Sequence, residues 1–125
     1  METAVIIEGN PLFRQELEAA FHSHFPSIEV VGADNGEKAM EFMETLPPDL
    51  VLIDVKLPDG NGFQLTRKIK DRRPDVTIII LSSHDSPEYR QAARMSGGDY
   101  IILKESPLEA YFGLIELILS GRGQS

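Results

Sequence analysis

Two acids, a hydroxyl and an amine stand directly after apolar runs of this sequence. They are Glu8, Asp54, Ser82 with its neighbour Ser83, and Lys104. A carboxylate can act as a nucleophile, and a divalent cation held by oxygen ligands neutralises charge on phosphoryl oxygens. A lysine and a hydroxyl can bind the remaining oxygens. Any one of these residues is more often a helix cap or a surface residue, but together they are the set that phosphoryl transfer to a carboxylate requires.

Five apolar runs of strand length recur along the chain, and amphipathic stretches separate them. The runs are continuous in valine, isoleucine and leucine, which is typical of strands buried on both faces in a parallel sheet. They predict strands at Ala4–Ile7, Ile28–Gly32, Leu50–Ile53, Val76–Leu81 and Tyr100–Leu103.

Capping residues mark where the intervening helices begin and end. Asn10-Pro11 predicts an N-cap followed by proline in the first turn, and Asp34–Glu37 predicts a capping box. Ser86-Pro87 starts a helix that ends at Gly97-Gly98, and Ser106–Glu109 starts the last helix. The alternation of strands and helices with short connections predicts a doubly wound α/β sheet with right-handed crossovers.

The predicted topology places the reactive side chains together. In open α/β sheets, ligands bind beyond the carboxyl ends of the strands. Because Glu8, Asp54, Ser82 and Lys104 each follow a different predicted strand, we expect them to converge at that edge. A chain of 125 residues suits one domain. We place this domain at residues 1–120, with residues 121–125 as a disordered tail or the start of a linker.

Composition and charge narrow the possible functions. The sequence has no cysteine, which excludes disulfides, thiolate metal sites and thiol redox chemistry. The net charge of −8 argues against direct nucleic-acid binding, which depends largely on lysine and arginine contacts with phosphates. The basic cluster Arg67–Arg73 is interpreted as the solvated end of a helix. No apolar run approaches the roughly 18–20 residues that span a bilayer, the first residues do not resemble a signal peptide, and no nucleotide-binding glycine loop is present.

The residues quoted above lie in longer matching stretches. The sequence resembles the receiver domain of bacterial response regulators along nearly its whole length. The pattern Asp-x-x-Leu-Pro-x-x-x-Gly after a buried strand is the most specific feature, and the similarity is greatest to receivers that precede a helix-turn-helix output domain. The matching stretches are Asn10–Gln15, Pro48–Asp54, Leu57–Gly62, Ile80–His84 and Leu103-Lys104.

This resemblance implies a fold and a role for each site residue. The fold is (βα)5, with a five-stranded parallel sheet in the flavodoxin-like order 2-1-3-4-5. Asp54 accepts a phosphoryl group from a histidine of a partner kinase, Ser82 reports that modification, and Lys104 pairs with a phosphoryl oxygen. Magnesium is held by Glu8, by Asp54 and by the backbone carbonyl of Lys56.

The resemblance also implies a cellular setting and partners. We expect a phosphorelay signalling module of the bacterial cytoplasm that catalyses at most its own phosphorylation and dephosphorylation. Its expected partners are a sensor histidine kinase or phosphotransfer protein and an output domain or effector protein, with neither nucleic acid nor membrane bound by this chain. The family precedent is a homodimer through the fourth helix, fifth strand and fifth helix. Phosphorylation is expected to bias a two-state equilibrium in the loops after the fourth and fifth strands.

The sequence departs from the family at Gly9. The family usually places two adjacent acids after the first strand and uses the second as a magnesium ligand, whereas this chain has Glu8-Gly9. Loss of a residue that merely supports a metal ligand costs roughly 10–100-fold in affinity or activity, so we expect weakened magnesium binding, with water filling the position. The alternative is a pseudo-receiver, a protein-interaction module that works without phosphorylation. The loop Glu8–Pro11 lacks the hydroxyl- and glycine-rich character of a flavin phosphate site, which argues against a third hypothesis, a flavodoxin-like cofactor binder.

Further departures concern the switch. The family often carries an aromatic residue three positions before the lysine, where this chain has Ile101, and the neighbouring Tyr100 is expected to point to the opposite face of the sheet. Glu105 stands where many relatives have proline, which removes the expectation of a cis peptide bond. Lys56 and His84 occupy positions that influence the lifetime of the phosphoryl group in relatives, and both are equally compatible with plain surface residues.

Overall fold

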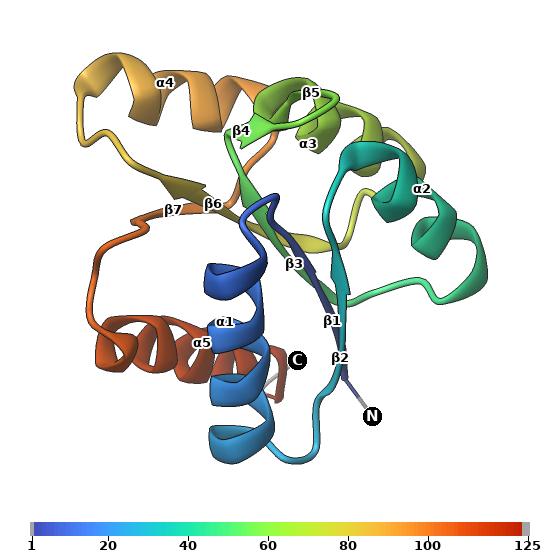
Figure 1. Ribbon diagram of the computed structural model, residues 1–125, viewed down its shortest axis with the longest axis vertical. Coiled ribbons are helices and arrows are strands. Elements are labelled where there is room, and N and C mark those ends of the chain that lie inside the picture. The colour runs from blue at the N-terminus through green and yellow to red at the C-terminus, as the bar shows by residue number, and fades with distance from the viewer. Residues whose placement is uncertain (1, 124–125) are drawn as a thin grey trace.

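The computed structural model describes residues 2–123, which form a parallel sheet with helices on both faces (Figure 1). The sheet strands are β1 (Thr3–Ile7), β2 (Glu29–Ala33), β3 (Leu50–Asp54), β6 (Thr77–Ser82) and β7 (Tyr100–Leu103). The helices are α1 (Pro11–His24), α2 (Gly36–Thr45), α3 (Gly62–Arg72), α4 (Pro87–Ser96) and α5 (Leu108–Gly123). A short hairpin of β4 (Lys56–Leu57) and β5 (Gly60–Asn61) follows β3.

The sheet has the predicted topology. Its five strands follow the order β2-β1-β3-β6-β7, and every neighbouring pair is parallel. This confirms the doubly wound sheet and the order 2-1-3-4-5, because the hairpin β4–β5 only adds two labels between the third and fourth sheet strands. The hairpin itself was not predicted, since strands of two residues are too short to produce a recognisable pattern.

Both faces of the sheet are covered, and alternate strand residues enter two separate core layers. In β3, Val51 and Ile53 pack on the side of α2, α3 and α4, whereas Leu50 and Leu52 pack on the side of α1 and α5. Figure 1 shows the same division of the helices between the two faces. The central strands β1, β3 and β6 are buried on both faces almost throughout, so they can be apolar at nearly every position, and this produces the continuous runs seen in the sequence. The edge strands β2 and β7 are partly exposed.

Helix caps are confirmed at α1 and α4 but shifted at α2. Asn10 caps α1 by accepting hydrogen bonds from the first-turn amides, and Ser86 caps α4 in the same way. Gly97 ends α4 with a left-handed φ of 101°. The capping box predicted at Asp34–Glu37 is wrong in register: Asn35 is the N-cap. The third helical position is therefore a lysine, which cannot return the reciprocal hydrogen bond of a capping box.

Element boundaries differ from the prediction by a few residues. The strands predicted to begin at Ile28 and Val76 begin one residue later, because ladder hydrogen bonds rather than side-chain polarity define strand ends. Helix α5 continues to Gly123, beyond the predicted boundary at residue 120, and residues 124–125 lie outside the described residues. The division between domain and tail stays a prediction. Among residues 2–123, no helix combines the length and the apolar character needed to cross a membrane.

The register of the strands places the carboxyl ends of β3 and β6 and of β6 and β7 beside each other. Asp54 of β3 lies opposite Leu81 of β6, and Ser82 lies opposite Leu103 of β7. Lys104 follows directly after β7, so it leaves the sheet at the same edge as Asp54 and Ser82.

Gly62 allows α3 to start against the backbone of β3, and this can be tested. A Cβ atom at this position would overlap the carbonyl oxygen of Asp54 and lie 2.9 Å from Val55 Cα. The backbone of β3 cannot move aside without breaking its packing. We therefore expect Gly62→Ala to lower the free energy of unfolding by about 1–3 kcal/mol. The matched control is Gly113→Ala in α5, where a Cβ would meet no atom within 4 Å. It should raise stability by about 0.5–1 kcal/mol, because alanine is the better helix former. Urea denaturation measures both changes, and a Gly62→Ala variant as stable as the parent would contradict this account.

Candidate functional site

Three of the charged residues predicted for the site meet at the carboxyl edge of the sheet. The Nζ atom of Lys104 lies 2.9 Å from Glu8 Oε1 and 3.1 Å from Asp54 Oδ2. Glu8 directly follows β1 and is 1% exposed, and Asp54 ends β3 and is 7% exposed. One ammonium group therefore contacts two carboxylates that are almost entirely withdrawn from water, and it balances only one of their two negative charges when both are ionised.

The carboxylate of Glu8 is buried in a position that is energetically unfavourable for a charged group. Its Oε2 atom accepts a hydrogen bond from the amide of Asn10 at 2.9 Å. Its Oε1 atom is in ion-pair contact with Lys104, but within residues 2–123 no well-directed hydrogen bond reaches it. Burial, and the nearby charge of Asp54, raise the pKa of Glu8 against the opposing effects of Asn10 and Lys104. A raised pKa means that this position disfavours the ionised carboxylate, so ionised Glu8 reduces the stability of the fold.

Lys104 is positioned by packing as well as by its acidic partners. Burial alone would lower the pKa of Lys104, but the hydrogen bonds and charges of Glu8 and Asp54 raise it overall. Tyr111 of α5 donates a hydrogen bond from its hydroxyl to the carbonyl oxygen of Lys104 at 2.9 Å. Burial raises the pKa of Tyr111, so this hydroxyl keeps the proton that it donates. The ring of Phe13 in α1 lies 5.0 Å from Nζ, within the range of a cation–π interaction.

Ser82 reaches the same edge, but its hydroxyl bonds within its own loop. The Oγ atom donates to the carbonyl oxygen of His84 at 2.9 Å and accepts from the amide of His84 at 3.0 Å. The His84 ring stacks on Tyr89 of α4, with centroids 4.7 Å apart, and Tyr89 makes an edge contact with Phe63 of α3 at 6.0 Å. The neighbouring Ser83 is exposed and lies outside this network. Ser82 is thus connected to α4 through His84 and Tyr89.

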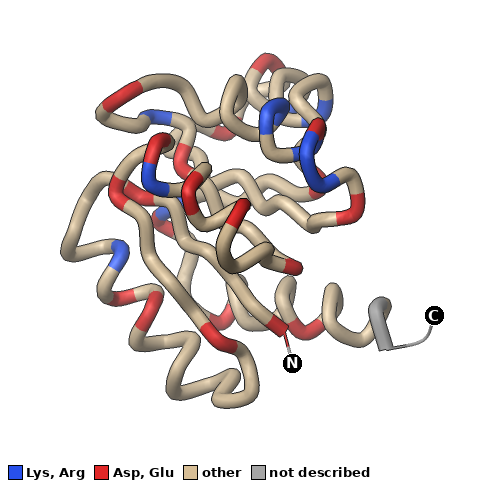
Figure 2. Tube along the Cα trace, turned by 90° about the vertical axis from the view of Figure 1, so that its right-hand side faces the viewer, with Lys and Arg blue, Asp and Glu red and all other residues tan. Residues whose placement is uncertain are grey.

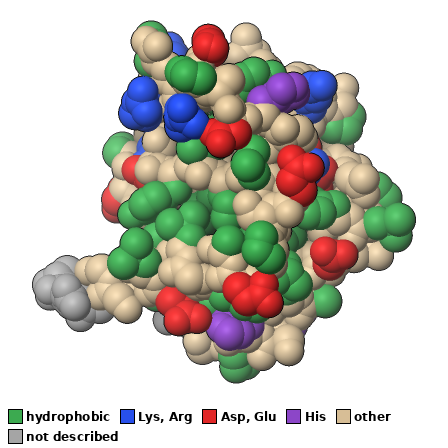
Figure 3. Space-filling model, turned by 90° about the vertical axis from the view of Figure 1, so that its left-hand side faces the viewer, with side chains coloured by type: hydrophobic (Ala, Val, Ile, Leu, Met, Phe, Trp, Pro, Cys, Tyr) green, Lys and Arg blue, Asp and Glu red, His purple; other side chains and the backbone are tan. Residues whose placement is uncertain are grey.

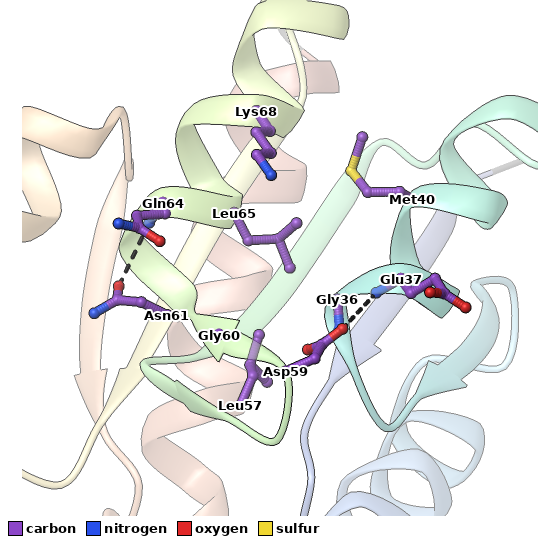
Figure 4. A pocket seen from close by; sticks show the side chains of 10 residues that line it. All are labelled: Gly36, Glu37, Met40, Leu57, Asp59, Gly60, Asn61, Gln64, Leu65 and Lys68. Carbon is purple, nitrogen blue, oxygen red and sulfur yellow. Dashed lines mark hydrogen bonds between the residues drawn. The ribbon is translucent and has the colours of Figure 1, made fainter.

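The hairpin that follows β3 is tied to two helix N-termini. Asp59 in its turn accepts hydrogen bonds from the first two amides of α2, Gly36 at 2.8 Å and Glu37 at 3.0 Å. Figure 4 shows the Asp59 side chain directed at this helix end, beside a pocket between α2 and α3. The hydrogen bonds from α2 lower the pKa of Asp59. Asn61 caps α3 in the same manner, so the segment that begins at Lys56 is anchored at two points.

Sequence reasoning missed three residues that shape the site. Arg14 of α1 donates from its guanidinium to the carbonyl oxygen of Glu8 at 2.7 Å and so supports the loop after β1. Tyr111 was not singled out, and Asp59 stood only at a variable position of the Asp-x-x-Leu-Pro-x-x-x-Gly pattern. No sequence signal identifies these contacts, because each depends on how a helix lies against a loop at the edge of the sheet.

Oxygen donors suited to a metal are few at this edge. Asp54 Oδ1 accepts a long hydrogen bond from the amide of Lys56 at 3.4 Å, and Glu8 Oε1 lacks a directed donor. Gly9 supplies no ligand, and a Cβ there would lie 3.1 Å from Pro58 Cδ. The part of the chain that the structure describes contains no group of three or more acidic, histidine or cysteine side chains placed to hold a metal. The carboxylates of Glu8 and Asp54 and the backbone carbonyl of Lys56 are nevertheless oxygen ligands of the kind that magnesium accepts, and magnesium usually keeps several waters.

Known proteins share this sequence pattern. The family model of the response regulator receiver domain matches residues 4–116. The transcriptional regulatory protein DegU of Brevibacillus brevis is 33% identical over 118 residues, which cover 94% of this chain and 50% of that protein. The nitrate/nitrite response regulator protein NarL of Escherichia coli K12 is 33% identical over 104 residues, which cover 82% of this chain and 48% of that protein. The chain thus spans about half the length of the curated relatives it matches.

A solved structure shares the architecture. The two-component response regulator from Clostridium difficile aligns with a TM-score of 0.90 at 25% identity, covering 96% of this chain and 97% of that one. The family match over most of the chain, the two relatives above 30% identity and the shared fold lead to one conclusion. This chain belongs to the response regulator receiver domain family, the signalling modules of two-component systems.

Proposed function

We propose that Asp54 accepts a phosphoryl group from a histidine of a sensor kinase or phosphotransfer protein, and that this modification switches the binding of an output domain or effector. The observation that carries the proposal is the contact of one Lys104 ammonium with both Asp54 and Glu8, at 3.1 and 2.9 Å. A buried carboxylate beside a fixed cation can act as a nucleophile and can hold the charge that arrives with the phosphoryl group. Receiver domains are signalling modules, so we propose no metabolic substrate.

The proposed reaction exchanges one phosphorus bond for another. A carboxylate oxygen of Asp54 attacks phosphorus while the bond between phosphorus and the donor imidazole nitrogen breaks, and the electron pair of that bond stays on the imidazole. Lys104 then pairs with one phosphoryl oxygen. The Ser82 hydroxyl leaves the carbonyl oxygen of His84 and donates to another phosphoryl oxygen.

Magnesium, when bound, neutralises charge on the phosphoryl oxygens. Glu8, Asp54 and the backbone carbonyl of Lys56 are the groups of this chain that we propose to hold it. Gly9 contributes no carboxylate to this set, and Lys104 already occupies the space between the two acids. We therefore propose that magnesium binding is weak.

The proposed switch runs through α4. Movement of Ser82 releases the backbone of His84, whose ring stacks on Tyr89 at the start of α4. Residue 101 cannot supply the aromatic side chain common in the family, because it is an isoleucine that packs against the core beside α2, α3 and α4. Tyr100 is 39% exposed and stands outside that layer. Tyr89 is therefore the aromatic residue that we assign to this coupling.

The face formed by α4, β7 and α5 suits a protein partner. Figure 3 shows hydrophobic side chains gathered in a hollow on this side of the molecule. Tyr100 of β7 and Leu117 of α5 are 39% and 65% exposed. We propose that this face forms the homodimer expected from family precedent, in the bacterial cytoplasm where response regulators typically act.

A second candidate function is a pseudo-receiver that binds partners without phosphorylation. The incomplete donor set at Gly9 favours it, together with the pairing of Lys104 with both acids. Beryllium fluoride with magnesium mimics the phosphorylated state. Tight binding of this complex at ordinary millimolar magnesium would exclude the pseudo-receiver.

Phosphoryl acceptance can be tested by mass spectrometry. Incubation with acyl phosphate and saturating magnesium should add one phosphoryl mass to the protein, and Asp54→Asn should abolish the addition. Asp75→Asn is the matched control, since Asp75 is exposed and lies at the opposite end of β6. The proposal fails if the parent chain gains no mass, or if the addition persists in Asp54→Asn.

The role of Gly9 can be tested by a magnesium titration of the same reaction. Gly9→Asp should lower the magnesium concentration that gives half-maximal labelling by at least about tenfold, because it adds a carboxylate to the donor set. Gly9→Ala is the control for the added Cβ, which must displace Pro58 slightly in either variant. Equal magnesium dependence in all three proteins would show that Gly9 is not the limiting defect.

The cost of Glu8 can be tested by stability measurements against pH. The pKa of Glu8 is raised in the folded state, so the fold favours the protonated carboxyl. The protonated carboxyl adds to the free energy of unfolding at low pH, and this contribution is lost as pH rises through the folded-state pKa. Glu8→Gln removes this loss and should be more stable than the parent at neutral pH. The difference should vanish toward about pH 4, where carboxyls become protonated. Urea denaturation across this range measures it, and a Glu8→Gln variant that is less stable at neutral pH would show that the ion pair with Lys104 outweighs burial.

A further inference from the structure

A groove between α3 and α4 lies apart from the acidic site. Its volume is about 630 Å³. Phe63 of α3, with Ala92 and Met95 of α4, gives it an apolar surface, while Arg67 and Lys68 of α3 add two positive charges against the one negative charge of Asp71. Met95 is 69% exposed, and a flexible methionine adapts readily to apolar partners. We call this feature the α3–α4 groove.

The surroundings of the α3–α4 groove are basic in an otherwise acidic protein. Residues 56–98 contain eight lysines and arginines against five aspartates and glutamates, whereas residues 1–55 contain two against eleven. Figure 2 shows the lysine and arginine positions gathered along α3 and the acidic positions spread over the rest of the chain. A locally positive surface of this kind attracts an acidic partner even when the net charge is −8.

The two cations of the groove are not used in ion pairs of the fold. Lys70 and Arg72 of the same helix pair with Asp99 and Glu44. Arg67 and Lys68 form no ion pair within residues 2–123 and are exposed, although Arg67 donates one hydrogen bond across the groove to a carbonyl oxygen of α4. Their charges remain available to a ligand.

We propose that the α3–α4 groove binds an acidic amphipathic helix of a partner protein. Such a helix presents apolar side chains at positions i, i+3, i+4 and i+7. Those side chains would cover Phe63, Ala92 and Met95, while glutamates or aspartates beside them meet Arg67 and Lys68. The apolar surface distinguishes this occupant from a nucleic-acid backbone, which offers phosphates but no side chains to bury.

The groove is connected to the switch residues by aromatic contacts. Phe63 lies against Tyr89 at 6.0 Å, and Tyr89 stacks on His84 at 4.7 Å. His84 in turn exchanges two hydrogen bonds with Ser82. A ligand that covers Phe63 therefore touches the first member of a series of contacts that ends at Ser82, at the same edge of the sheet as Asp54. The binding itself does not require phosphorylation of Asp54, so its test is independent of the proposed function.

The test uses the isotopically labelled chain and two synthetic helical peptides. The first peptide carries leucine at i, i+3, i+4 and i+7 with glutamate on both flanks, and the second has glutamine in place of each glutamate. We expect the acidic peptide to shift the backbone amide resonances of α3 and α4 around the groove, and the glutamine peptide to bind more weakly. Peptide binding confined to another face, or equal binding of both peptides, would overturn the proposal.

Charge-reversal variants assign the binding to the groove. Arg67→Glu and Lys68→Glu should each raise the dissociation constant roughly twofold to tenfold, as expected for exposed charge pairs. Arg94→Glu is the matched control, because Arg94 is an exposed cation of α4 that does not line the groove. Lys68 makes no hydrogen bond across the groove, so Lys68→Glu remains informative if Arg67→Glu fails to fold. An equal loss of affinity in Arg94→Glu would show that only the net charge of the protein matters, and it would overturn the assignment of the binding site to the α3–α4 groove.

Two other occupants are distinguished in the same experiment. A DNA duplex that displaces the acidic peptide from the same amides at lower concentration would overturn the proposal in favour of a nucleic acid. Resonances of the groove that shift with protein concentration alone, together with dimerisation in sedimentation, would overturn it in favour of a second copy of this chain.

Discussion

Lys104 joins the ends of three strands through its charge. Its ammonium lies between Glu8 after β1 and Asp54 at the end of β3, although β7, which Lys104 directly follows, is separated from β3 by β6. Two nearly buried carboxylates so close together repel each other and lose hydration, and the cation between them offsets part of that cost. Tyr111 and Phe13 hold the lysine from α5 and α1, so helices on one face of the sheet determine the chemistry at its edge.

The loops around this ion pair are held by groups that also complete helix ends. Asp59 satisfies the first amides of α2, and Asn61 satisfies those of α3, where amides have no partners within the helix. Gly62 lets α3 start in contact with the backbone of β3. The same bonds that cap helices thus restrain the segment next to Asp54. A reactive carboxylate in a mobile loop would lose the positioning on which phosphoryl transfer depends.

Burial and charge oppose each other at Glu8. Its buried carboxylate lacks a directed hydrogen bond on one oxygen, and its raised pKa shows that burial costs more than its partners return. Positions that break local rules in this way are typical of functional sites, where a fold tolerates a cost that activity requires. Gly9 beside it carries no charge, and Pro58 lies so close that a Cβ at this position would be 3.1 Å from Pro58 Cδ.

Local patterns made much of this molecule predictable. Apolar runs located all five strands of the sheet to within a residue or two, because strands covered on both faces admit few polar residues. Caps at Asn10 and Ser86 were predicted from residue type, since the capping hydrogen bond involves only neighbours in the chain. The cap of α2 was misplaced by one residue, because the contact of its first amides with the distant Asp59 leaves no local signal. The β4–β5 hairpin was missed, because its strands have only two residues each.

The sequence by itself determined that Glu8, Asp54, Ser82 and Lys104 follow strands of one parallel sheet, and therefore that they reach one edge. It did not determine which of them touch. Only the tertiary structure decided that Lys104 bridges the two acids while Ser82 turns to His84, because these contacts depend on strand register and side-chain rotamers. The α3–α4 groove is likewise a product of packing: Arg67 and Met95 are far apart in the chain, and the approach of two helices makes them neighbours.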